Sequence, residues 1–413
     1  MIENRRKITS LSLLLMTFSA VFSFPNIINN SIQIGLRTIP AFLFGSIFYF
    51  LPFALMVGEF ASANSESESG IHSWIRNSLG EKWAFLGAWS YFFVNMLFSI
   101  SLVPSTLIYT SYTFFGGNVF GGNKGTLVIS ILSVIVFWII TYIGMKGISW
   151  MSKVTNVAGV AKIFMGIVFI ILAFVIVYGF KNLPAQEFTY KSITPNVNWT
   201  FFMTMAWILQ AFAGNESIGV YVSNVKGGNR VFIKTMIIST IVIGGLYVLG
   251  CIAVGFIVPD EVLHNNFSNG IFDVFSILGG HFGVSKQIIT RIVGLILMLS
   301  NLCSLVIWSS IPVKVLFSEI PEGIFGKWIT KTNKEGNPKN ALIVQATVAT
   351  IFLFVFFMST VPDPVLILQA LNGTLPEGEG NPILIFLYNV SGLVIFLGFA
   401  LVCWNKHVRK LSN

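Results

Sequence analysis

The chain has 413 residues, of which 54% are hydrophobic and 10% are charged, and its mean hydropathy is +0.80. A soluble domain usually has about 25% charged residues, so this composition excludes an ordinary soluble protein and predicts an integral membrane protein. The net charge of +9 comes from Lys and Arg residues scattered among short loops, which excludes a basic nucleic-acid-binding domain. All three cysteines, Cys251, Cys303 and Cys403, lie in apolar runs, so we expect neither a disulfide framework nor a metal site.

Ten apolar runs are each about as long as the 20 helical residues that cross the hydrocarbon core of a bilayer. Strands of a membrane barrel would alternate apolar and polar residues over short segments, and these runs do not. The sequence therefore predicts an all-α membrane protein, in which lipid surrounds the chain. The predicted spans are residues 8–33, 39–61, 83–114, 126–146, 150–180, 199–224, 231–258, 285–317, 341–360 and 381–404.

The basic residues set the expected orientation, because loops on the cytoplasmic side of a membrane are enriched in Lys and Arg. With the N-terminus in the cytoplasm, most of the 25 Lys and Arg residues fall on the cytoplasmic side. We therefore expect a multi-pass protein of a bacterial cell membrane, plasma or inner, with both termini in the cytoplasm. The acidic stretches 259–273 and 361–379 then lie outside.

Two of the ten runs are interrupted by residues that disfavour a continuous helix. The first run holds Ser23 and Pro25, and the sixth holds Gly214, Asn215 and Glu216. The two runs occupy matching places in two halves of five spans, residues 8–180 and 199–404. Five is an odd number, so the second half would be inverted, and paired interruptions in inverted halves mark the binding sites of many transporters.

Interrupted helices leave backbone N–H and C=O groups that lipid cannot satisfy. Helix N-termini favour a carboxylate and helix C-termini favour an ammonium group, so an amino acid suits such a place. Each break alone is also compatible with helix packing, for which Gly is common in membrane helices. The candidate substrate-binding residues at the breaks are Ser19, Ala20, Phe22, Ser23, Phe212, Ala213, Gly214, Asn215 and Glu216.

Three stretches give the chain a resemblance to a known superfamily. Residues 52–61 read Pro-Phe-Ala-Leu-Met-Val-Gly-Glu-Phe-Ala, and residues 69–89 hold Ser-Gly-Ile-His-Ser-Trp followed by Leu-Gly-Glu-Lys-Trp. With the Gly-Asn-Glu at 214–216 and the run from Arg291 to Trp308, they resemble the amino acid–polyamine–organocation (APC) transporters, and most closely the glutamate:GABA antiporter group. The resemblance covers essentially the whole chain.

The resemblance implies a LeuT-like fold, with a 5+5 inverted repeat and broken helices 1 and 6 in one transporter domain over residues 1–413. Members usually have twelve helices, whereas ten are predicted here, so the C-terminal helices and tail that can serve in dimerisation or pH gating are absent. The oligomeric state stays open. A transport-inactive or sensor-like truncated paralogue is the alternative to an active transporter.

Lys162 lies two to three turns into the fifth predicted span, where a lysine can either snorkel to the cytoplasmic face or serve in coupling. The resemblance favours coupling, because proton-coupled members carry a fifth-helix lysine in a similar Val-x-Asn-Val context. Its ammonium occupies the place where sodium-coupled relatives hold a cation.

Glu216 and Trp308 each have two readings. A carboxylate inside a membrane is a functional candidate by default, so Glu216 is a candidate for proton coupling, but it can equally bond freed backbone groups of helix 1. Trp308 matches an aromatic residue that flanks the substrate in the family, and it can equally be a packing residue.

The sequence thus predicts a secondary active transporter of amino acids or related amines. It would work by exchange or proton-coupled symport with alternating access. No Walker motif, His–Glu metal motif or nucleophile elbow occurs, so we expect neither ATP-driven transport nor an enzyme, and no cofactor. The expected partners are the substrate, membrane lipid and protons, with no nucleic acid.

Overall fold

The computed structural model describes residues 8–65, 70–120, 122–146, 148–264, 270–318, 325–333 and 337–360. Helices dominate these residues, and one isolated bridge joins Ile8 to Val225. The predicted all-α class is confirmed. The chain forms two compact units, and the boundary between them falls within two long helices, α6 (Glu81–Phe115) and α15 (Lys286–Phe317).

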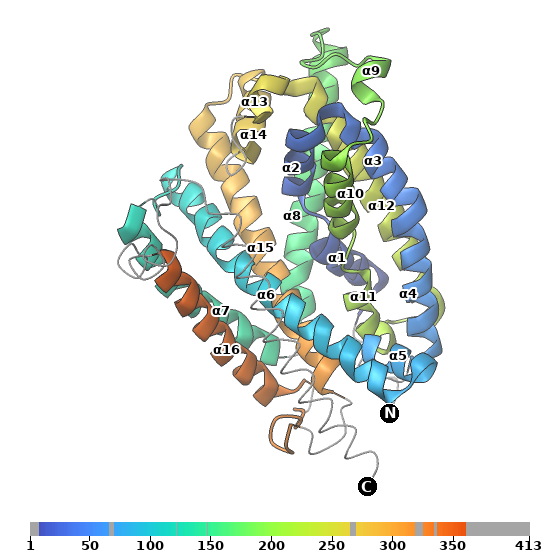
Figure 1. Cartoon of the computed structure of the whole chain (residues 1–413). Coiled ribbons are helices and arrows are strands. Elements are labelled where there is room, and N and C mark those ends of the chain that lie inside the picture. The colour runs from blue at the N-terminus through green and yellow to red at the C-terminus, as the bar shows by residue number, and fades with distance from the viewer. Residues whose placement is uncertain are drawn as a thin grey trace. The chain divides into compact units, whose positions relative to one another are not determined.

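Unit 1 comprises Met1–Gly70, Ser105–Val119 and Ile148–Ile307. It holds both interrupted helices, which Figure 1 shows as α1 followed by α2 and as α10 followed by α11. Besides the parts of α6 and α15, its helices are α1 (Ser10–Val21), α2 (Phe24–Ile34), η2 (Gly35–Arg37), α3 (Thr38–Gly45), η3 (Ser46–Phe50), α4 (Leu51–Ala63), α8 (Ile148–Phe174), η4 (Val175–Gly179), α9 (Tyr190–Ile193), α10 (Trp199–Ala211), α11 (Asn215–Ile218), η5 (Gly219–Asn224), α12 (Gly228–Ile257), α13 (Asp260–His264) and α14 (Gly270–Gly280).

The helices follow the predicted spans closely. Six described segments are long and apolar enough to cross a membrane, and the first of them, Ser10–Ala63, contains two predicted spans. The sixth predicted span falls short of that length because its break limits α10 to 13 residues. The ninth is the apolar helix α16 (Lys339–Thr360), and the tenth, 381–404, lies outside the described residues.

Helix α12 is the packing centre of unit 1, because it contacts α1, α2, α3, α4 and α8. Its buried side chains include Phe232, Ile243 and Tyr247, each with no exposed surface. In lipid, burial of apolar groups against each other gains little, so close packing matters more than in a soluble core. The glycine Gly159 of α8 provides such a close approach: a Cβ added there would lie 2.5 Å from the carbonyl oxygen of Leu15 in α1.

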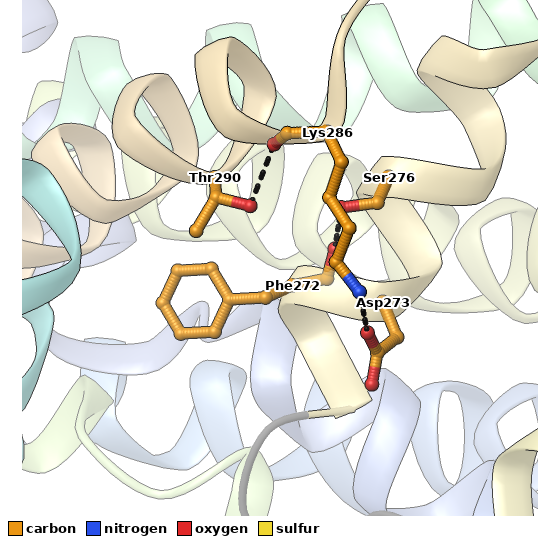
Figure 2. Close-up of polar contacts among 5 residues, drawn as sticks. All are labelled: Phe272, Asp273, Ser276, Lys286 and Thr290. Carbon is orange, nitrogen blue, oxygen red and sulfur yellow. Dashed lines mark hydrogen bonds and ion pairs between the residues drawn. The ribbon is translucent and has the colours of Figure 1, made fainter. Parts of the chain in front are cut away.

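The short helix α14 contacts α12 and is joined to α15 by an exposed ion pair. Lys286 Nζ lies 3.1 Å from Asp273 Oδ1, and the Thr290 hydroxyl donates to the Lys286 carbonyl oxygen, as Figure 2 shows. The lysine side chain is 73% exposed, so this pair contributes little to stability.

Unit 2 comprises Ile71–Pro104, Phe120–Gly147 and Trp308–Asn413. It holds α5 (Ile71–Leu79), the first part of α6, α7 (Gly122–Met145), the last turns of α15 and α16. Helices α7 and α16 lie side by side, and the indole nitrogen of Trp138 donates to the Thr350 hydroxyl. Aromatic rings from α6, α15 and the segment 325–333 pack together in unit 2, namely Phe85, Trp89, Phe92, Phe317 and Phe325.

The crossing of α1 and α8 can be tested at Gly159. Replacing Gly159 with Ala puts a methyl group against backbone atoms of α1 that cannot rotate away, so the two helices must move apart. We expect a clear fall in the yield of monodisperse protein on size-exclusion chromatography. The matched control is Gly245→Ala in α12, where an added Cβ meets nothing within 4 Å, so the yield should stay equal or rise. Equal yields from the two variants would contradict the packing described.

Candidate functional site

The first break separates α1 from α2. Helix α1 ends at Val21, Phe22 and Ser23 are extended, and α2 begins at Phe24. Pro25 stands in the first turn of α2, where its missing N–H costs nothing, and it prevents α1 from continuing through. The predicted interruption of helix 1 is confirmed.

The second break separates α10 from α11. Helix α10 ends at Ala211 and α11 begins at Asn215, after a turn in which Gly214 has a φ of +131°. Glu216 Oε2 accepts from the Gly214 N–H at 2.8 Å, and the Ser217 hydroxyl donates to the Gly214 carbonyl oxygen at 2.6 Å. A carboxylate at the start of a helix is also favoured by the helix dipole. Glu216 therefore caps its own break, whereas the structural reading of this residue expected bonds to the backbone of helix 1.

The two breaks face each other. A Cβ added to Gly214 would lie 3.3 Å from the backbone carbon and oxygen of Ala20. Only a glycine allows this approach, both for its positive φ and for the space. The two interruptions therefore lie against each other. The residues around them that are half-buried are Ala20, Ser23, Ala213 and Glu216.

Lys162 connects the first break to two other helices. Its side chain is 6% exposed, and its Nζ donates to the Ser19 carbonyl oxygen at 2.7 Å and to Ser304 Oγ at 3.0 Å. The Ser304 hydroxyl in turn donates to the Ser19 carbonyl at 2.8 Å, and the Ser19 hydroxyl donates to the Thr155 carbonyl at 2.6 Å. The last turn of α1 is therefore fastened to α8 and α15 by side chains with charge-assisted bonds.

Tyr247 of α12 joins both breaks from the other side. Its fully buried hydroxyl accepts from the Ser23 N–H at 3.1 Å and from Asn26 Nδ2 at 3.4 Å. It lies within donating distance of two carbonyl oxygens, Val21 at 3.1 Å and Ala211 at 3.4 Å. Sequence reasoning missed this residue. The available signal was a phenol within an apolar membrane span, where a polar group needs a partner.

The remaining candidates are placed in different surroundings. Phe22 and Phe212 are fully buried and pack against Tyr247, with ring centroids 5.0 and 5.4 Å away. Asn215 is buried, and its Nδ2 lies 3.4 Å from Thr240 Oγ1. Trp308 belongs to unit 2, where its ring lies edge-on to Phe98 with centroids 5.5 Å apart.

Comparisons with known proteins find a matching family and several related transporters. A family model described as "Amino acid permease" matches residues 8–410. The chain is 24% identical to the aspartate/glutamate permease AcaP of Lactococcus lactis subsp. cremoris, over 99% of this chain and 82% of that protein. It is 26% identical to the inner membrane transporter YjeM of Salmonella typhimurium, over 84% of this chain and 74% of that one.

A glutamate/gamma-aminobutyrate antiporter of Lactococcus lactis subsp. lactis is 22% identical over 98% of the chain and 78% of its own length. Among solved structures, MhsT in complex with L-phenylalanine matches with a TM-score of 0.58 and 14% identity, covering 90% of this chain and 82% of that one. This structural match supports the predicted LeuT-like fold.

The role of Tyr247 can be tested by removing only its hydroxyl. In Tyr247→Phe the ring still packs among Phe22, Phe42 and Phe212, but the buried Ser23 N–H loses its acceptor. An unsatisfied buried donor costs about 1–3 kcal/mol. We expect the thermal midpoint of the detergent-solubilised protein to fall by several degrees. Tyr178→Phe is the control, because that ring is 68% exposed at η4, and its midpoint should not change. A Tyr247→Phe midpoint equal to the parent's would contradict the assignment.

Proposed function

This chain belongs to the amino acid permease family, and we propose that it carries amino acids or related amines by proton-coupled symport, with the substrate held at the facing breaks of α1–α2 and α10–α11. The observation that carries the proposal is the Lys162 ammonium on the Ser19 carbonyl oxygen, beside the first break. It puts an ionisable group in contact with the helix that has to move.

The breaks supply the groups that an amino acid needs. At the first break, N–H groups at the start of α2 would attract a carboxylate. The start of α11 is already capped by Glu216. Carbonyl oxygens at the ends of α1 and α10 attract an ammonium group. The half-buried Ala20, Ser23, Ala213 and Glu216 are the proposed contacts nearest the substrate. Ser19, Phe22, Phe212, Gly214 and Asn215 would shape the site from behind. The substrate-flanking role of Trp308 stays a prediction from the family resemblance.

The surroundings of Lys162 suit coupling to protons better than coupling to sodium. The ammonium is bonded to two neutral oxygens, those of Ser19 and Ser304, which together resemble the oxygen donors that hold a monovalent cation. Here the lysine itself supplies the positive charge. A lysine can lose its proton, whereas an arginine cannot, so the contact can be made and broken during a cycle.

Loss of the proton would remove the charge-assisted bonds between α8 and the last turn of α1. That turn would then rely on the Ser304 and Tyr247 hydroxyls, and α1 would be freer to move. Alternating access in this proposal is the movement of the broken helices between a bonded and a released state. In the alternative, an obligate exchanger, the charge stays in place and only holds the fold.

The relatives' names narrow the first substrates to try. We propose acidic amino acids and GABA as the first arm of a counterflow screen in proteoliposomes, with neutral amino acids and amines as the second. Uptake of any labelled compound against its preloaded partner supports a transporter. No uptake from either arm would favour the transport-inactive or sensor-like paralogue. Residence in a bacterial cell membrane with both termini in the cytoplasm belongs to the same proposal.

Coupling is tested by Lys162→Met, which keeps the bulk of the stem and deletes the charge. In sodium-free buffer, the parent should accumulate the counterflow substrate when the pH is lower on the outside of the proteoliposomes. The variant should still exchange substrate but lose accumulation driven by the pH gradient. The control is Lys153→Met, an exposed lysine on the same helix, which should accumulate like the parent. Unchanged accumulation in Lys162→Met, or strict dependence of the parent on sodium, would refute proton coupling through this lysine.

A further inference from the structure

A cavity lies within unit 1, and none of its described lining residues belongs to either helix break. It has a volume of about 570 Å³ and opens to the surface. Three segments far apart in the sequence form its walls: residues 33–37 at the end of α2 and in η2, residues 185–192 in the loop after η4 and in α9, and residues 259–261 at the start of α13. A cavity of a few hundred Å³ is large enough for a small organic ligand.

The loop wall is fixed by hydrogen bonds to the end of α12. The N–H groups of Ala185 and Gln186 donate to the carbonyl oxygens of Phe256 and Gly255 at 2.9 and 3.0 Å. Gln186, which is 9% exposed, also donates through Nε2 to the Val258 carbonyl at 2.8 Å. This wall is therefore preformed, and a ligand entering the cavity would lose little binding energy to ordering it.

The opposite wall is fixed as well. Arg37 Nε donates to the Thr194 carbonyl oxygen at 3.2 Å, which ties the turn after α2 to the loop after α9. Gly35, with a φ of +58°, brings this turn close to α13, because a Cβ added there would lie 3.7 Å from Asp260 Oδ1. A guanidinium and a carboxylate thus line the same cavity from neighbouring segments.

Among the residues that the structure describes, the ionisable side chains lining the cavity are one guanidinium, Arg37, and three carboxylates, Glu187, Asp260 and Glu261. A carboxylate on a ligand would meet the planar guanidinium, which suits it in geometry and charge. The excess of carboxylates would favour a ligand with a net positive charge. An α-amino acid with a basic side chain carries one carboxylate for the guanidinium and two cationic groups for the carboxylates, so it matches the lining in sign.

We propose that this cavity is a second ligand site that binds a basic amino acid, with Arg37 holding the α-carboxylate and the carboxylates holding the two cationic groups. The site is separate from the one proposed at the helix breaks, and it does not depend on what is transported there. A ligand here would bridge the turn after α2 to the junction after α12, two elements that flank the broken helix 1.

The test uses L-lysine as probe and equilibrium dialysis of the purified full-length protein in detergent. We expect saturable binding that weakens about tenfold in Arg37→Gln and in Glu187→Gln, since each variant removes a charge-assisted contact. Glu187 lies on an exposed loop, so its replacement should leave the fold intact. The matched controls remove the same charges from the exposed pair in Figure 2, by Lys286→Gln and Asp273→Asn, and should bind like the parent.

Two further probes test the carboxylate and the cationic groups of the ligand separately. Putrescine, which has two ammonium groups and no carboxylate, should bind at least tenfold more weakly than L-lysine, and L-glutamate should not compete. The proposal is overturned if L-lysine shows no saturable binding, or if both cavity variants bind it like the parent. Putrescine bound as tightly as L-lysine, or L-glutamate competing on equal terms, would also overturn it. None of these outcomes bears on transport at the helix breaks.

Discussion

The structure of unit 1 depends on how the backbone groups released at the break of helix 1 are satisfied. A lipid-embedded helix has no water to bond its free N–H and C=O groups, and each unsatisfied group costs several kcal/mol. Here buried side chains from three helices meet this need. Lys162 of α8 and Ser304 of α15 bond the Ser19 carbonyl, and Tyr247 of α12 bonds the Ser23 N–H.

These bonds stabilise the break, and one of them depends on the protonation of Lys162. The bonds of Ser304 and Tyr247 come from hydroxyl groups, which keep their state over the physiological range, whereas the bond from Lys162 depends on a proton. The second break is satisfied largely from within, through Glu216 and Ser217. Helix 1 therefore depends on its neighbours, while the turn before α11 carries its own cap. This asymmetry favours α1 as the element that responds to a change of protonation.

The sequence predicted those features that depend on residues close together in the chain. Pro25 and Gly214 act on their own backbone, so the sequence indicated both breaks. Lys162 was identified as a candidate for coupling from its depth in the span together with the family resemblance. Tyr247 could not be found in this way, because its role depends on which carbonyl oxygens α12 brings near its hydroxyl. Likewise, nothing local distinguishes Phe22 and Phe212, which are buried among aromatic rings, from residues facing a substrate. The cavity lined by Arg37 also has no sequence signature, since its three segments meet only in the fold.

The central claim is that the Lys162 ammonium holds the end of helix 1 in place. Hydrogen–deuterium exchange, followed by mass spectrometry in detergent, measures this directly. In Lys162→Gln, peptides covering residues 18–26 should exchange faster than in the parent, while peptides from α12 exchange at the parent's rate, because their packing does not involve the lysine. Unchanged exchange over residues 18–26, or an equal increase along α12, would contradict the account.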